Sequence, residues 1–438
     1  MASASPQGPA SASPTQSMLP LEKVFSIQIG TELFRLSGAS VASDAPSYFS
    51  RFFEEQLCQS SDGSNIRTLY IDRDPVTFQQ IARHLQGYHV QPRDGSEYVK
   101  LFADAQFYSL PRLISQLFES EIFIQIGDRN FQIPRDLFNG PGDSPNFFSL
   151  GFAAFFASKG QIFPGLDRHG LLRPPAITPT SVPSRSGEVF AQILHLLRGY
   201  PLHIKNREHR EELLRDCTYY HLRGLEQKLI PHDISFNPIL GSSEIVIGLE
   251  HVRRSGLQVP PPSSGGGWVT YSRPYTDDET HDLILEVGDQ STVIDLHQMR
   301  ARFLNLAKMR VATLLRVVAD QLREKTQGTD QSGETSPDDR GVPIRLDPDM
   351  DLTVNGQATS YAEVFTDPDQ GHPAKRRRLE EGDTTGTAGI WNVSKGQWRL
   401  HVQCAAHQSE PDFSLVAVKL DVYTGQRLRN RARPFLGP

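Results

Sequence analysis

An internal repeat over residues 22–231 limits the folds open to this chain more than any other feature of its sequence. The segment Ile27-Gln28-Ile29-Gly30 returns 97 residues later as Ile124-Gln125-Ile126-Gly127, and the alternating apolar residues around each glycine predict a β-hairpin in both places. Two longer segments then match without a gap at a constant offset of 112: residues 78–88 with 190–200, and residues 101–117 with 213–229. A common register through three expected helices is not a chance likeness, so the sequence predicts two diverged copies of one α/β module.

The second copy is the longer of the two, because the offset between matching residues grows from 97 to 112 along the repeat. The extra residues fall at about 168–186, where four prolines predict a loop: Pro174, Pro175, Pro179 and Pro183. We therefore place module 1 at residues 21–120 and module 2 at residues 121–231, with a Pro-rich insertion in module 2. Residues 1–20, rich in Ala, Ser and Pro, are expected to be a disordered tail.

Module 1 carries a specific pattern after its hairpin: Leu69-Tyr70-Ile71-Asp72-Arg73-Asp74-Pro75, then Phe78, and later Ala105-Gln106-Phe107-Tyr108-Ser109-Leu110. This pattern resembles the T1-type BTB/POZ domain, the tetramerisation domain of voltage-gated potassium channels, which also occurs in related soluble proteins. The resemblance is strong over residues 22–120 and weak over residues 121–231. As a tandem pair, the chain resembles a group of mostly uncharacterised fungal BTB/POZ proteins.

This resemblance implies a module without catalytic residues that forms homo-oligomers and docks protein partners. Self-association is assigned to module 1, and cullin-3 ubiquitin ligases are a candidate partner because some BTB families bind them. Asp74 is placed to cap the helix that begins at Pro75. Asp72 and Arg73 either pair locally or lie at a subunit interface, so Asp72, Arg73 and Asp74 are the candidate oligomer interface or turn.

Module 2 departs from this pattern. Where the Asp-Arg-Asp-Pro turn is expected, it reads Leu171-Leu172-Arg173-Pro174-Pro175, so we expect module 2 to have lost the turn. It then either packs against module 1 or presents a different surface to partners.

The C-terminal half resembles no family known to us. Residues 232–280, with a Pro-, Ser- and Gly-rich run at 260–267, are expected to be a linker. Residues 281–438 are expected to be a small α+β domain with a basic amphipathic helix at about 296–325 and disordered loops at about 326–345 and 366–389. The expected fold is therefore α+β: two consecutive BTB/POZ (T1-like) modules, then a small α+β C-terminal domain, with disordered linkers.

One of these loops contains four consecutive cations after Pro373-Ala374: Lys375, Arg376, Arg377 and Arg378. The run resembles a monopartite nuclear-import signal, which importins bind as an extended chain. The alternative is a solvated run of charge. On the first interpretation an importin is a candidate partner, and the expected location is the nucleus, the cytoplasm or both.

Composition removes several other classes of function. The net charge of −6 argues against nucleic-acid binding as the main activity. The basic helix and the arginines at 427–433 still leave a nucleic-acid-associated nuclear factor as the alternative to a non-enzymatic adaptor. The three cysteines are far apart and form no zinc motif, so we expect no metal and no cofactor. We also expect no catalysis, because no known catalytic motif is present, and no membrane span, because no apolar stretch approaches about 18–20 residues.

Overall fold

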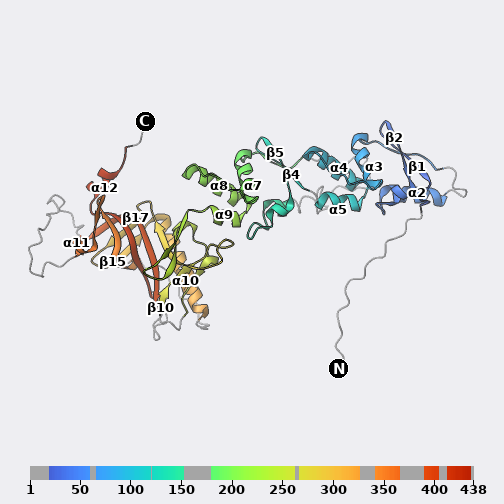
Figure 1. Cartoon of the computed structure of the whole chain (residues 1–438). Helices are drawn as coiled ribbons and strands as arrows, with labels where there is room; N and C mark the ends of the chain where they lie inside the picture. Colours follow the sequence, from blue (N-terminus) through green and yellow to red (C-terminus); the bar gives the residue numbers. More distant parts are fainter. Residues whose placement is uncertain are drawn as a thin grey trace, which may run out of the picture. The chain divides into compact units, whose positions relative to one another are not determined.

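The computed structural model describes residues 19–59, 66–119, 121–151, 179–261, 266–325, 341–365, 389–403 and 412–435. They belong to two compact units, Met1–Glu226 and Gln227–Pro438, which we describe separately as unit 1 and unit 2. In Figure 1, unit 1 runs from blue to green and unit 2 from green to red. The predicted disordered tail, apart from Leu19 and Pro20, lies outside the described residues.

In its described residues, module 1 combines a three-stranded sheet with five helices. The strands β1 (Val24–Ile29), β2 (Glu32–Ser37) and β3 (Leu69–Ile71) have the order β2-β1-β3, with β1 and β2 antiparallel and β1 and β3 parallel. The helices are α1 (Gly38–Ala42), α2 (Tyr48–Gln59), α3 (Pro75–Leu85), α4 (Gly95–Phe107) and α5 (Pro111–Glu119). Asp94 caps α4 by accepting a hydrogen bond from the Glu97 N–H at 2.8 Å.

Module 2 has the same strand order and the same pairing directions. Its sheet, β5-β4-β6, contains β4 (Ile122–Ile126), β5 (Arg129–Ile133) and β6 (Ser181–Val182), with β4 and β5 antiparallel and β4 and β6 parallel. The described helices are η1 (Arg135–Phe138), α7 (Gly187–Leu197), α8 (Arg207–Tyr220) and α9 (Arg223–Leu229).

Both modules are built around a triangle of buried aromatic rings at matching positions. In module 1 the centroid of Phe49 lies 4.7 Å from that of Tyr108 and 5.7 Å from that of Phe78. In module 2 Phe148, Phe190 and Tyr220 have centroids 5.0–5.4 Å apart. Phe78, Phe190, Tyr108 and Tyr220 belong to the matched segments from which the sequence predicted the repeat, and all six rings fill the cores.

The strand register corrects one prediction about module 2. Ile126 pairs with Val182 on β6, as Ile29 pairs with Ile71 on β3. The segment after Val182 therefore stands where the Asp-Arg-Asp-Pro turn stands in module 1, and its arginine is Arg185. The expected counterpart, Leu171–Pro175, falls within residues 152–178, which lie outside the described residues. The prediction failed because a two-residue strand leaves no periodic pattern in the sequence.

The described part of unit 2 contains a 12-stranded sheet that begins inside the predicted linker. Residues 232–280 form the strands β7 (His232–Asn237), β8 (Ser242–Gly248), β9 (Leu257–Gln258), β10 (Gly266–Trp268) and β11 (Thr270–Tyr271). The linker prediction was wrong, because β8 runs parallel to β12 (His281–Val287) and buries Ile245 and Ile247. The short turns η3 (Leu249–His251) and η4 (Arg254–Gly256) follow β8.

The rest of unit 2 is α+β. Its elements are β13 (Thr292–Asp295), β14 (Arg300–Phe303), α10 (Asn305–Lys325), β15 (Val342–Val354), β16 (Gln357–Thr359), α11 (Tyr361–Phe365), β17 (Ile390–Gln403), β18 (Asp412–Tyr423) and α12 (Gln426–Ala432). The pairings β13-β14-β15-β18-β17-β13 close into a ring. One face of β17 places Trp398, Leu400 and Val402 in the core, where all three are fully buried.

Two boundaries in unit 2 differ from those expected. The helix begins at Asn305, because residues 300–303 pair with β13 and β15 as strand β14. The loop predicted at about 326–345 ends earlier than expected, since β15 starts at Val342. Residues 326–340 and 366–388, including Lys375, Arg376, Arg377 and Arg378, lie outside the described residues.

Candidate functional site

The turn between β3 and α3 fixes a buried arginine in module 1. Arg73 forms an ion pair with Asp104 on α4, and its guanidinium lies 4.8 Å from the ring centroid of Phe107. The two charged side chains are only 13% and 4% exposed. Burial raises the pKa of Asp104, although the arginine beside it acts in the opposite direction.

Module 2 contains the same three-part contact. Arg185 lies 3.1 Å from Asp216 on α8, and its guanidinium is 4.1 Å from the ring centroid of Tyr219. Burial again raises the pKa of the carboxyl group. The pair is more open to solvent than that of module 1, with exposed fractions of 24% and 8%.

The hairpin glycines are explained by the backbone of these arginines. Gly30 has a φ of +54°, and a Cβ atom there would lie 3.1 Å from the carbonyl oxygen of Arg73. Gly127 has a φ of +57°, and its Cβ would lie 2.7 Å from the carbonyl oxygen of Arg185. Both the left-handed conformation and the close approach require glycine at these two positions.

In each module a buried aspartate also accepts backbone N–H groups at the start of the last helix. Asp44 accepts hydrogen bonds from the N–H groups of Arg112 and Leu113, at 2.7 and 3.1 Å, in the first turn of α5. Burial alone would raise its pKa, but these bonds and a 2.9 Å contact with His84 lower it. In module 2, Asp143 accepts the N–H of Leu225 in the first turn of α9 at 2.9 Å.

The three residues predicted as an oligomer interface or turn have different surroundings. Asp74 caps α3, because its carboxylate accepts the N–H groups of Val76 and Thr77 at 3.2 and 3.3 Å. Arg73 points inward to Asp104, and Asp72 is exposed. Arg73 and Asp74 thus have local partners, as the turn interpretation requires, and both Asp72 and Asp74 have exposed side chains.

A different surface distinguishes the modules. On the outward face of the module 1 sheet, Leu33 and Tyr70 flank Gln28 in one row across the strands. Leu33 is 53% exposed and Tyr70 is 60% exposed. The corresponding row in module 2 is polar, with Asn130 and Ser181 on either side of Gln125.

Part of the module 2 sheet face is covered by module 1 itself. Phe123 on β4 is buried, and its ring centroid lies 5.3 Å from that of Tyr98 on α4. Next to this contact, the guanidinium of Arg135 lies 4.9 Å from the ring centroid of Phe118 on α5. The two modules therefore pack through unlike surfaces, the helical side of module 1 and the sheet side of module 2.

A sequence profile of the BTB/POZ domain matches residues 25–118, which is the module 1 fold just described. Residues 25–118 are a BTB/POZ domain of the potassium-channel-tetramerisation type.

The chain is also similar to two proteins of Saccharomyces cerevisiae. It is 38% identical to the uncharacterized protein YDR132C over 272 residues, which is 60% of this chain and 53% of that protein. It is 34% identical to the BTB/POZ domain-containing protein YLR108C over 250 residues, 56% of this chain and 48% of that protein. The chain thus spans about half the length of the curated relatives it matches.

The resemblance of module 1 to the BTB/POZ family is therefore confirmed. Sequence reasoning missed the apolar row on the outward face of the BTB sheet. Its signal was present, because Tyr70 stands between the apolar Leu69 and Ile71, and Leu33 is out of step with Phe34 and Leu36, which alternate toward the core. Within the described ranges, no helix is long and apolar enough to span a bilayer, and no group of three metal-binding side chains gathers.

Proposed function

We propose that this protein is a non-enzymatic adaptor that self-associates through its BTB domain and docks protein partners. The observation that carries the proposal is the exposed row of Leu33 and Tyr70 on the outward sheet face. Val24 belongs to the same face of β1 and is 59% exposed. Tyrosine and large aliphatic side chains gathered on one exposed face are typical of protein interaction sites.

We further propose that module 2 is a diverged BTB module that no longer uses this face for assembly. Its strand order, its aromatic core and its half-buried Arg185–Asp216 pair all match module 1. Its outward row is polar, and Phe123 on the same face is covered by α4 of module 1. These features support an asymmetric pair in which module 1 forms the homo-oligomer and module 2 packs against module 1.

Light scattering on the full chain after size-exclusion chromatography tests the assembly role. The native chain is expected to be an oligomer, and the double variant Leu33→Glu/Tyr70→Glu a monomer, because two carboxylates would have to be desolvated in the interface. The matched control is Asn130→Glu/Ser181→Glu, which makes the same change on the module 2 row and is expected to leave the mass unchanged. A native chain that stays monomeric at high micromolar concentration would remove the proposal of self-assembly.

The partner and the location remain proposals from the sequence. Cullin-3 is proposed as a ligase partner, and an importin is proposed to bind Lys375, Arg376, Arg377 and Arg378. A fluorescent fusion with these four residues changed to alanine is expected to shift from nucleus to cytoplasm. An unchanged distribution would remove the import signal, and a purified cullin-3 fragment that does not bind the native chain would remove that partner.

Nucleic-acid association is the alternative proposal, and it rests on the exposed cations of α10 and on the arginines at 427–433. Lys308, Arg310 and Arg316 are exposed on this helix, whereas Arg300 and Arg302 lie on β14. Dividing the predicted basic face between two elements makes a continuous phosphate track harder to form. Retention of the chain on DNA or RNA at low salt would favour this alternative over a purely protein-binding role.

A further inference from the structure

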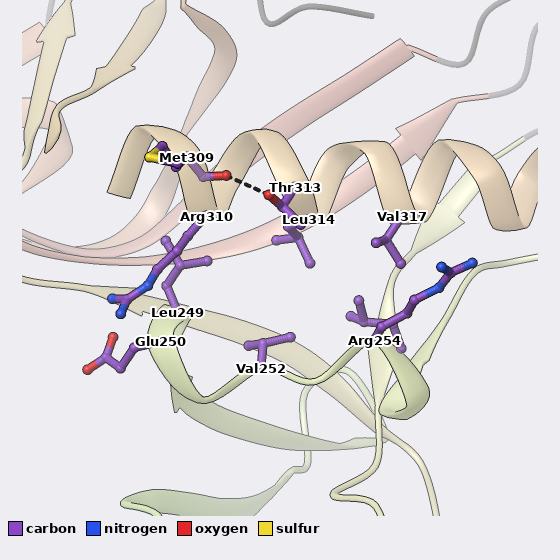
Figure 2. Close-up of a pocket in the computed structure, with 10 residues that line it drawn as sticks. Leu249, Glu250, Val252, Arg254, Met309, Arg310, Thr313, Leu314 and Val317 are labelled. Atoms are coloured by element: carbon purple, nitrogen blue, oxygen red, sulfur yellow. Dashed lines mark hydrogen bonds between the residues drawn. The ribbon is translucent and has the colours of Figure 1, made fainter. Parts of the chain in front are cut away.

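A groove in unit 2 lies between helix α10 and the segment of η3 and η4 (Figure 2). Its walls are mainly apolar, with Leu249, Val252 and Leu257 on one side and Leu314 and Val317 on the helix. The cavity volume is about 230 Å³. Pockets that enclose small-molecule ligands are larger, at roughly 300–1,000 Å³, so this groove fits one or two side chains of a partner chain.

Charged side chains mark both ends of the groove. Figure 2 shows Arg254 at one end and Arg310 with Glu250 at the other. Arg316, two turns along the helix from Met309, is exposed nearby. Within the described ranges, none of these three arginines forms an ion pair, whereas Glu250 lies 4.0 Å from His251. The rim therefore favours an anionic group, and an acidic carboxylate binds arginine through charge-assisted hydrogen bonds.

The outer side of α10 extends the apolar wall beyond the groove. Leu306 is 65% exposed and Met309 is 69% exposed, and with Thr313 and Val317 they follow one side of the helix. An unbranched, polarisable methionine adapts to the shape of a partner side chain. The described apolar surface is thus longer than the groove, as expected where a peptide lies along a helix.

We infer that this groove binds a peptide segment of a partner protein, which inserts one large apolar side chain and places an acidic residue against Arg254. The apolar walls exclude a ligand that is charged throughout, and the three arginines disfavour a basic peptide. A nucleic acid fits less well, because no aromatic side chain lines the groove for base stacking and Glu250 would repel a phosphate. The site is independent of the BTB domain and of the assembly proposed for it.

Selection from a phage library of random dodecapeptides on the immobilised full chain provides the probe. The enriched peptides are expected to share a large apolar residue with Asp or Glu one to three positions away. Fluorescence anisotropy of a labelled winning peptide then measures affinity for three variants of the full chain. Thr313→Trp, which fills the groove, and Arg254→Glu, which reverses the charge at one end, are each expected to weaken binding at least tenfold.

The matched control is Arg302→Glu, which makes the same charge change at an exposed arginine on β14 and is expected to alter affinity less than twofold. Thermal melting followed by tryptophan fluorescence checks that unit 2 of each variant folds. Enrichment of basic peptides, no enrichment, or equal binding by all three variants would overturn the inference. So would a labelled 20-nucleotide oligothymidine whose binding is lost in Arg254→Glu and Thr313→Trp, since that result assigns the surface to nucleic acid.

Discussion

The two modules of unit 1 are alike inside and unlike outside. The Arg73–Asp104 pair, the aromatic triangle and the buried Asp44 of module 1 have counterparts at matching positions of module 2. On the outward sheet face, by contrast, Leu33 and Tyr70 are replaced by Asn130 and Ser181. The groups that hold the fold thus match between the two modules, and the outward sheet surface differs. The modules differ in what they can bind more than in how they fold.

The largest effect is expected from removing the buried arginine. Arg73→Ala leaves Asp104 buried without its cation, and should lower the free energy of unfolding of module 1 by about 3–5 kcal/mol. Arg185→Ala should cost less, about 1.5–3 kcal/mol, because the Arg185–Asp216 pair is more exposed. Hydrogen exchange of peptides from α4 and α8, measured by mass spectrometry in the full chain, reports each module. Equal costs in the two modules would contradict the difference inferred from burial.

A matched pair of variants tests whether the buried aspartates have the same role. Asp44→Ala leaves the N–H groups of Arg112 and Leu113 unpaired, and Asp143→Ala removes the acceptor for Leu225. Each should destabilise its own module by about 1–3 kcal/mol. Faster exchange should appear in α5 for the first variant and in α9 for the second. If either change left its helix protected, the shared capping role would be wrong.

Asp44 also predicts a pH dependence. The pKa of its carboxyl group is lower in the folded protein, so the stabilisation is present above the unfolded pKa of about 3.9 and is lost as the pH falls through the lower folded value. Hydrogen exchange of α5 in chemical denaturant, measured at pH 7 and at successively lower pH, should show this loss of stability. Asp44→Asn, which cannot ionise, should show a flatter profile, and a profile as steep as the native one would assign the acid sensitivity to other groups.

The smallest effect is expected from the hairpin glycines. Gly30→Ala and Gly127→Ala both place a side chain at a positive φ, which should cost about 1–2 kcal/mol each. Gly127→Ala should be the more costly, because its Cβ would lie closer to a carbonyl oxygen, 2.7 Å against 3.1 Å. Exchange rates of the β1–β2 and β4–β5 hairpins measure the two costs. A larger cost for Gly30→Ala than for Gly127→Ala would show that the hairpin loop of module 2 adjusts more easily to the added side chain.

The repeat was visible in the sequence because long helices and core aromatics keep their spacing. Phe78 and Phe190, for example, match at the same offset as Tyr108 and Tyr220, and all four meet in the cores. Short strands leave no such signal, so the turn at Arg185 was assigned to the wrong segment. Of the strands taken for a linker, β9, β10 and β11 are equally short. β8 and β10 also pair with strands farther along the chain, β12 and β17.

The candidate sites were predicted less well than the fold. The local pattern around Asp74 predicted its capping role, since a helix cap depends only on neighbouring residues. The row of Leu33 and Tyr70 depends on which strands pair, and the groove beside α10 depends on how a helix packs on distant turns. Neither property is contained in one stretch of sequence.

The fully buried Trp398 and the two other tryptophans, Trp268 and Trp391, all belong to unit 2, and unit 1 has none. Fluorescence excited at the red edge of tryptophan absorption is therefore a spectroscopic label for unit 2 alone. Circular dichroism, in contrast, records the helices of both units. A urea titration followed by both signals should separate into two midpoints where the units unfold independently and coincide where they unfold as one. The natural positions of the tryptophans thus allow the coupling between the units to be measured without introducing a dye or changing a residue.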